Sequence, residues 1–81
     1  TFKNLKLAFE VLDMGGNSAC VLNAANEITN KAFLDGKISF LQIGDINENT
    51  IEKSEFIAMP TLEDYIETNK LARKLAEDFC N

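Results

Sequence analysis

The sequence predicts an all-α fold, a small four-helix bundle, and three observations favour this class. Apolar residues recur at spacings of three and four along most of the chain. Glycines, side-chain caps and a single proline divide this pattern into four segments. The 81 residues suffice for one hydrophobic core, so we expect a single domain over residues 1–81.

The first helix is expected from about Phe2 to Met14, followed by a stop at Gly15 and Gly16, because glycine adopts left-handed backbone at little cost. Its apolar residues fall on two stripes, the first made of Leu5, Ala8, Phe9 and Leu12 and the second of Leu7, Val11 and Met14. A helix with such a wide apolar surface is usually buried on several sides. We therefore expect part of this surface to need a covering partner beyond the four helices.

The second helix is expected to start after Asn17 or Ser18, both good N-caps, and to continue to about Leu34 before Gly36 stops it. Its apolar face is made of Val21, Ala25, Ile28 and Ala32. Small alanines on this face would let another helix approach closely.

The third helix is predicted from Ser39 and Gln42, whose spacing matches a capping box, and it should extend to about Lys53. An extended connector, Phe56–Met59, then precedes Pro60.

Thr61 is expected to cap the fourth helix, which should run to about Phe79. Its apolar stripe is predicted to contain Leu62, Tyr65 or Ile66, Asn69, Ala72, Ala76 and Phe79.

The charge balance argues against nucleic acid as a partner. The net charge is −5 and the sequence pI is about 4.5, whereas nucleic-acid binding depends on neutralising phosphates with basic residues. The densest basic group, Lys70, Arg73 and Lys74, lies near the end of a helix, where cations complement the helix dipole. No apolar run approaches the length that spans a bilayer and no signal-peptide pattern occurs, so we expect a cytoplasmic protein with no membrane partner.

The residues that usually carry chemistry are scarce. The chain has no histidine, and Cys20 and Cys80 are far apart in the sequence and fit helical core positions better than a disulfide framework. There is no glycine-rich nucleotide motif, and the stretch 45–56 lacks the glycine and the final glutamate of a calcium loop. We therefore predict no catalytic, cofactor-binding or metal-binding residue, and an isolated chain that is inactive as an enzyme.

One local sequence is unusual, the stretch Leu22–Glu27. Asn23 and Asn26 interrupt a helix interior, where asparagine is unfavourable, and Glu27 follows them. These three side chains are candidates for structural polar contacts or for contacts with another domain, and the structural role is favoured because most side-chain hydrogen bonds go to backbone or water.

This stretch, with residues 32–40 and Ile43, resembles the C-terminal helical domain of 1-deoxy-D-xylulose 5-phosphate reductoisomerase. The opening residues 5–10 are similar to the first helix of that domain, and residues 61–64 with Ala72 and Arg73 are similar to its last helix. The likeness covers nearly the whole chain in order. Thr29, Asn30 and Lys31, and likewise Asn47 and Asn49, are more polar than this family pattern leads us to expect.

The resemblance implies a supporting domain of a larger enzyme of the non-mevalonate isoprenoid pathway. That enzyme rearranges 1-deoxy-D-xylulose 5-phosphate and reduces the product with NADPH to 2-C-methyl-D-erythritol 4-phosphate, and it requires Mg or Mn. The implied partners are the upstream catalytic domains of the same polypeptide, in a homodimeric parent. It also implies a truncated start, and no methionine precedes Thr1.

The alternative is a free-standing acidic helical adaptor or a carrier-like binding module. Size, acidity and four helices suit an acyl-carrier-like protein. However, such a carrier needs an Asp-Ser-Leu attachment site, and none of the three serines is flanked in this way.

Overall fold

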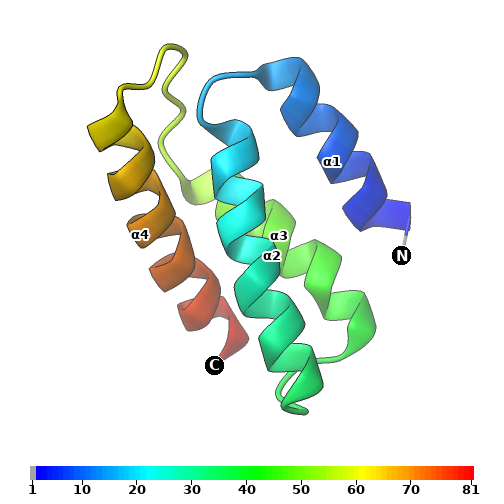
Figure 1. Ribbon diagram of the computed structural model, residues 1–81. Helices are drawn as coiled ribbons and strands as arrows, with labels where there is room; N and C mark the ends of the chain where they lie inside the picture. The colour runs from blue at the N-terminus through cyan, green and yellow to red at the C-terminus, as the bar shows by residue number, and fades with distance from the viewer. Residues whose placement is uncertain (1) are drawn as a thin grey trace.

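The computed structural model describes the backbone of residues 2–81 and the side chains of residues 3–81. Its helices are α1 (Phe2–Met14), α2 (Ser18–Leu34), α3 (Phe40–Lys53) and α4 (Leu62–Cys80). They pack as the small four-helix bundle shown in Figure 1. The predicted all-α class is confirmed, and the helices begin and end within about one residue of the predicted bounds.

Helix α2 lies at the centre of the bundle. It packs against α1, α3 and α4, whereas α1 and α4 lie on opposite sides of it (Figure 1). Ala24 and Ala25 of α2 and Ala72 and Ala76 of α4 are all completely buried. Because these side chains are small, α2 and α4 can approach closely. A second apolar cluster, of Ala32, Ile38, Ile43 and Ile46, joins the end of α2 to α3.

The two predicted side-chain caps are present. The side-chain oxygens of Ser39 and Thr61 each accept a hydrogen bond from the backbone N–H three residues later. The side chains of Gln42 and Asp64 in turn accept one from the backbone N–H of the cap residue. Asn17 behaves differently from the prediction. It occupies the N-cap position of α2, but its side chain makes no cap hydrogen bond, because it is used to hold the connector before α4.

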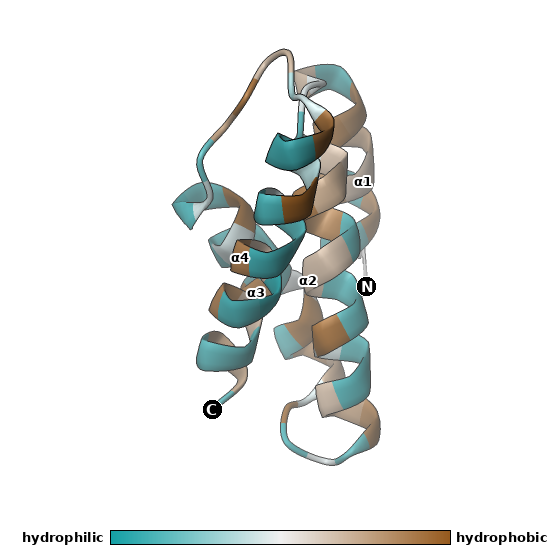
Figure 2. Ribbon diagram, turned by 60° about the vertical axis from the view of Figure 1, so that its left-hand side comes forward, coloured by the Kyte–Doolittle hydropathy of each residue, from teal (hydrophilic) through white to brown (hydrophobic). Residues whose placement is uncertain are grey.

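The two apolar stripes of α1 differ in their exposure to solvent. Leu7 and Val11 of the second stripe are buried at 4% exposure each, although Met14 at its end is exposed. Leu5, Phe9 and Leu12 of the first stripe remain 57%, 65% and 73% exposed. Apolar (brown) residues recur along α1 in Figure 2. The bundle therefore covers only one apolar side of this helix.

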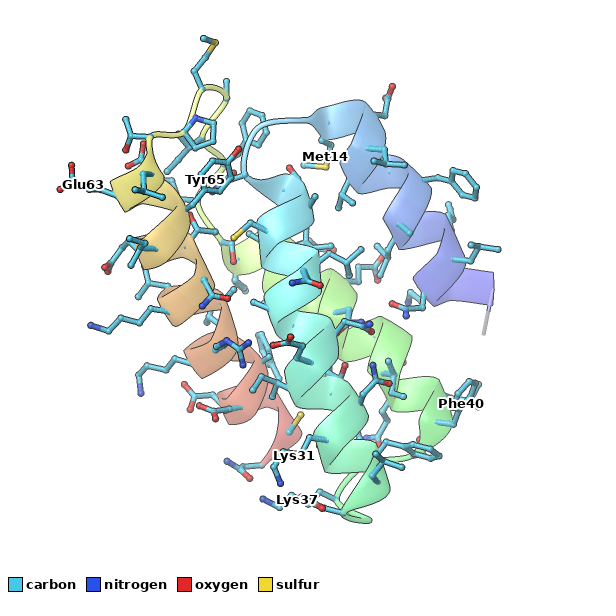
Figure 3. The ribbon with its side chains drawn as sticks, in the orientation of Figure 1. Met14, Lys31, Lys37, Phe40, Glu63 and Tyr65 are labelled. Atoms are coloured by element: carbon cyan, nitrogen blue, oxygen red, sulfur yellow. The ribbon has the colours of Figure 1, made fainter. Side chains whose placement is uncertain are left out.

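The buried stripe of α4 is narrower than predicted. Ala72 and Ala76 are buried as expected, and Asn69 is half-buried. The other predicted members are exposed, and Thr68 is buried instead: Leu62, Tyr65, Ile66 and Phe79 all face solvent. The reason is the close packing against α2, which admits small side chains at the contact and turns the larger ones outward. The labelled Tyr65 lies at the same end of α4 as Glu63 (Figure 3).

Candidate functional site

A partly buried cluster of three side-chain amides and one hydroxyl joins three helices, and we call it the amide cluster. It comprises Asn4 of α1, Asn26 and Thr29 of α2, and Asn47 of α3. The amide nitrogen of Asn47 donates to Oδ1 of Asn4 at 2.8 Å and to Oδ1 of Asn26 at 3.1 Å. The hydroxyl of Thr29 donates to Oδ1 of Asn47 at 3.0 Å, and Nδ2 of Asn4 donates to Oδ1 of Asn26 at 3.3 Å.

Asn47 is the centre of this cluster and is completely buried. Both of its amide hydrogens and its carbonyl oxygen have partners within the cluster. An unpaired buried amide costs about 1–3 kcal/mol, so this saturation is what makes a buried asparagine tolerable. The cluster contains no titratable group and therefore has no capacity for acid–base chemistry.

The three candidate residues of the sequence fall in different surroundings. Asn26 is half-buried and belongs to the amide cluster. Glu27 is exposed and forms an ion pair with Arg73 of α4, which links α2 to α4 at the surface. Asn23 is exposed on α2 and does not take part in the cluster.

A second buried asparagine fastens the turn between α1 and α2 to the connector before α4. Nδ2 of Asn17 donates to the carbonyl of Glu55 at 2.9 Å and to the hydroxyl of Thr68 at 3.1 Å, and its Oδ1 accepts from the backbone N–H of Ile57 at 2.8 Å. The backbone N–H of Asn17 also donates to the carbonyl of Ile57 at 3.0 Å. The side chain and backbone of Asn17 therefore provide hydrogen-bond partners for backbone groups of a segment that has no regular secondary structure.

Gly16 is needed where this turn meets the connector. Its φ of +58° lies in the left-handed region, and a Cβ there would overlap the carbonyl oxygen of Ile57 and lie 3.1 Å from Cα of Ala58. Both the conformation and the lack of space require glycine.

Sequence reasoning did not single out Asn4, Asn17 or Thr68 for buried contacts, and it noted Thr29 and Asn47 only as departures from a family pattern. A signal was present for two of them. Thr29 lies three residues after Asn26, and Asn47 follows Ile43 and Ile46 on the inner side of α3, so helical spacing placed both toward the core.

A groove of about 490 Å³ runs between the end of α3, the connector and α4. Ile57, Leu71 and Leu75 supply its apolar lining, and its charged residues carry both signs: Lys53, Glu55, Asp64, Glu67, Lys74 and Asp78. No ligand chemistry follows from this mixed rim. Within residues 3–81, no three side chains of His, Cys, Asp or Glu come together as a metal site.

The two cysteines are free and half-buried rather than fully buried. Burial raises the pKa of the Cys20 thiol. Burial also raises the pKa of Cys80, with Glu77 adding to the shift and Lys37 opposing it. A thiol with a raised pKa is a weak nucleophile at neutral pH, so neither cysteine has the environment of a reactive one.

Comparison with known proteins identifies the family to which this bundle belongs. The family model described as the DXP reductoisomerase C-terminal domain matches residues 1–75. The chain belongs to this family. The 1-deoxy-D-xylulose 5-phosphate reductoisomerase of Bacteroides thetaiotaomicron is 46% identical over 77 residues, which is 95% of this chain and 20% of that enzyme. The resemblance in the central stretch is thereby confirmed.

Other relatives agree. The reductoisomerase of Phocaeicola vulgatus is 49% identical over 75 residues, covering 93% of this chain and 20% of the enzyme. That of Thermoanaerobacter pseudethanolicus is 44% identical over 80 residues, covering 98% of this chain and 21% of the enzyme. No solved structure is significantly similar to the chain. The chain spans about one fifth of the length of the curated relatives that it matches.

Proposed function

We propose that this chain is the supporting C-terminal domain of a 1-deoxy-D-xylulose 5-phosphate reductoisomerase, folded as one domain over residues 1–81. The proposed parent reaction is the NADPH-dependent rearrangement and reduction of 1-deoxy-D-xylulose 5-phosphate to 2-C-methyl-D-erythritol 4-phosphate. The observation that carries the proposal is the 46–49% identity over more than nine tenths of the chain to one fifth of enzymes with this name.

The arrangement of polar groups supports a packing role. Asn4, Asn26, Thr29 and Asn47 hydrogen-bond to one another. Asn17 bonds to the connector and to Thr68. Side chains committed in this way hold helices in register and have little capacity left for a ligand. In this proposal Asn26 and Glu27 are structural contacts, and Asn23 is available to another domain.

The NADPH and the Mg or Mn that the family implies do not fit the residues described here. The described part of the chain has neither a glycine-rich phosphate loop nor a cluster of metal-ligating side chains. We therefore place both groups on upstream domains of the parent and derive no step through them. The parent is proposed to be a cytoplasmic homodimer. None of the helices described is both long and apolar enough to cross a membrane.

A binding experiment tests the proposal. The Bacteroides thetaiotaomicron enzyme would be truncated to remove the 77 residues that match, and the remaining upstream part would be mixed with this chain on a size-exclusion column. We expect the two to co-elute, as the upstream part should do with its own removed segment, which serves as the positive control. Co-elution of the native segment without any binding of this chain would contradict the proposal. The alternative of a free-standing adaptor or carrier gains no support from the comparisons.

A further inference from the structure

Helix α1 has an outward apolar face that the bundle leaves uncovered. Leu5, Phe9 and Leu12 follow one another at spacings of four and three, so they form a continuous stripe along one side of the helix. Their side chains are 57%, 65% and 73% exposed. The opposite side of α1 carries Leu7 and Val11, which are buried against the bundle, so rotating the helix would expose these residues instead.

The position of α1 in the fold makes this stripe accessible. Within the described residues, α1 packs against α2 and α3 but not against α4, and it forms one outer edge of the bundle (Figures 1 and 3). Lys3 fixes α1 to α3 through ion pairs to Asp45 at 2.7 Å and to Glu48 at 3.0 Å. The stripe is therefore presented on a helix that is held in place.

The composition around the stripe is that of an interface. Lys6, Glu10 and Asp13 lie beside Leu5 and Phe9 and border the stripe on one side with charges of both signs. An apolar centre with a polar, mixed-charge rim is the usual anatomy of a protein–protein contact.

The relatives indicate which polypeptide would cover the stripe. About four fifths of each relative lies outside the matched part. Because the matching family is a C-terminal domain, this unmatched part corresponds to sequence upstream of residue 1. It would enter the bundle at the start of α1, and Leu5 lies within the first turns of that helix. The upstream polypeptide therefore arrives directly beside the uncovered face.

We propose that the outer face of α1, made of Leu5, Phe9 and Leu12, is the surface on which the upstream domain of the same polypeptide docks. This inference rests on the proposed function and names the contact through which the supporting domain is attached.

The test uses a full-length chimaera, the Bacteroides thetaiotaomicron enzyme with its 77 matched residues replaced by those of this chain. Hydroxyl-radical footprinting with mass spectrometry would measure the oxidation rate of Phe9 in the folded chimaera and in the same chimaera unfolded in guanidinium chloride. A covered Phe9 should be oxidised about tenfold more slowly in the folded state, as in the buried centre of an interface. A ratio within about twofold, which an exposed fraction of 65% predicts, would overturn the proposal.

Two matched variants strengthen the test. Leu12→Lys places a charge in the stripe and should raise the oxidation rate of Phe9 several-fold, whereas Leu34→Lys, at a site 81% exposed near the other end of the bundle, should leave it unchanged. Because Leu12 is exposed within the bundle, its replacement does not disturb the core, and the footprint of the unmodified chimaera decides the question in any case.

Three further outcomes separate the possibilities. Protection of Phe9 that disappears on dilution would assign the stripe to a second copy of the chain and overturn the proposal. A chimaera that does not oxidise NADPH while Phe9 stays protected would count against the proposed function but support the docking surface. An active chimaera with an unprotected Phe9 would retain the proposed function and overturn the docking surface.

Discussion

At the scale of single residues, the bundle is specified by polar side chains as much as by apolar ones. The largest completely buried side chains are those of Asn17, Asn47, Thr29 and Thr50. Buried amides are costly unless every donor and acceptor is paired, so each of them restricts how the helices can pack. Thr29 and Asn47 depart from the expected family pattern in the same direction, and the structure shows that they hydrogen-bond to each other.

This pairing leads to a double-mutant prediction. Thr29→Val leaves Oδ1 of Asn47 without its donor and should lower the free energy of unfolding by about 1–2 kcal/mol. Asn47→Leu should lower it by about 2–3 kcal/mol, because Asn4, Asn26 and Thr29 each lose one hydrogen bond and Oδ1 of Asn4 loses its donor. The double variant should recover about 1 kcal/mol relative to the sum of the two single changes. Urea denaturation followed by circular dichroism measures all three. Strict additivity would show that the two side chains are not coupled.

The cysteines give a pH-dependent prediction. Because burial raises the pKa of Cys20 and Cys80, the folded chain holds the thiol protons more tightly than the unfolded chain does. The thiols therefore contribute stability that is fully present below the ordinary thiol pKa and declines as pH rises through the raised value. At pH 8, alkylation by iodoacetamide should be several-fold slower in the folded chain than in urea. Equal rates in the two states would contradict the raised pKa.

At the scale of elements, the helices were predictable because their signals are local. The spacing of Ser39 and Gln42 predicted the first capping box. Thr61 was predicted as a cap, and the structure adds Asp64 as its partner in a second box. Gly15, Gly16 and Gly36 have positive φ at the helix ends where glycine was expected. Apolar spacing together with these glycines placed α1 and α2 within about one residue of their bounds.

The contacts between elements were less predictable, because they depend on partners far apart in the sequence. Asn17 is a good N-cap by its type, but its side chain reaches residues 55–57, about forty positions away, and no local pattern reports this. In α4, apolar spacing correctly placed Ala72 and Ala76 in the core, but it also placed Leu62 and Phe79 there, which are exposed, and it missed the buried Thr68. In α1, spacing showed two apolar stripes and could not tell which of them the bundle buries.

The contact between the α1–α2 turn and the connector provides a prediction with a matched control. Gly16→Ala should lower the free energy of unfolding by about 2–4 kcal/mol, because strain at positive φ is added to an overlap with the backbone of Ile57. Gly15→Ala also places a side chain at positive φ, but its Cβ would meet nothing within 4 Å, so a loss of only about 1 kcal/mol is expected. Chemical denaturation compares the two variants. Equal losses would show that the connector does not pack on Gly16 as described.

At the scale of the whole molecule, the bundle has a well-packed core but leaves large apolar side chains exposed on its surface. Its centre is closed by alanine contacts, two apolar clusters and saturated amides, while one apolar side of α1 is left in solvent. The stripe consists of large apolar side chains, and no metal-binding cluster is assembled among the described residues. Both features are expected of a packing domain in a larger enzyme. The stretch Leu22–Glu27 was enough to indicate the family from the sequence. Only the structure shows which apolar side of α1 the bundle leaves uncovered.

The most direct measurement is steady-state NADPH oxidation in the presence of 1-deoxy-D-xylulose 5-phosphate and Mg²⁺. It would be made on the chimaera, on the truncated relative and on this chain alone. We expect the chimaera to retain activity within about tenfold of the intact relative, the truncated enzyme to lose at least about 100-fold, and the chain alone to show no turnover. Turnover by the isolated chain, or a chimaera no more active than the truncated enzyme, would contradict a supporting role for this bundle.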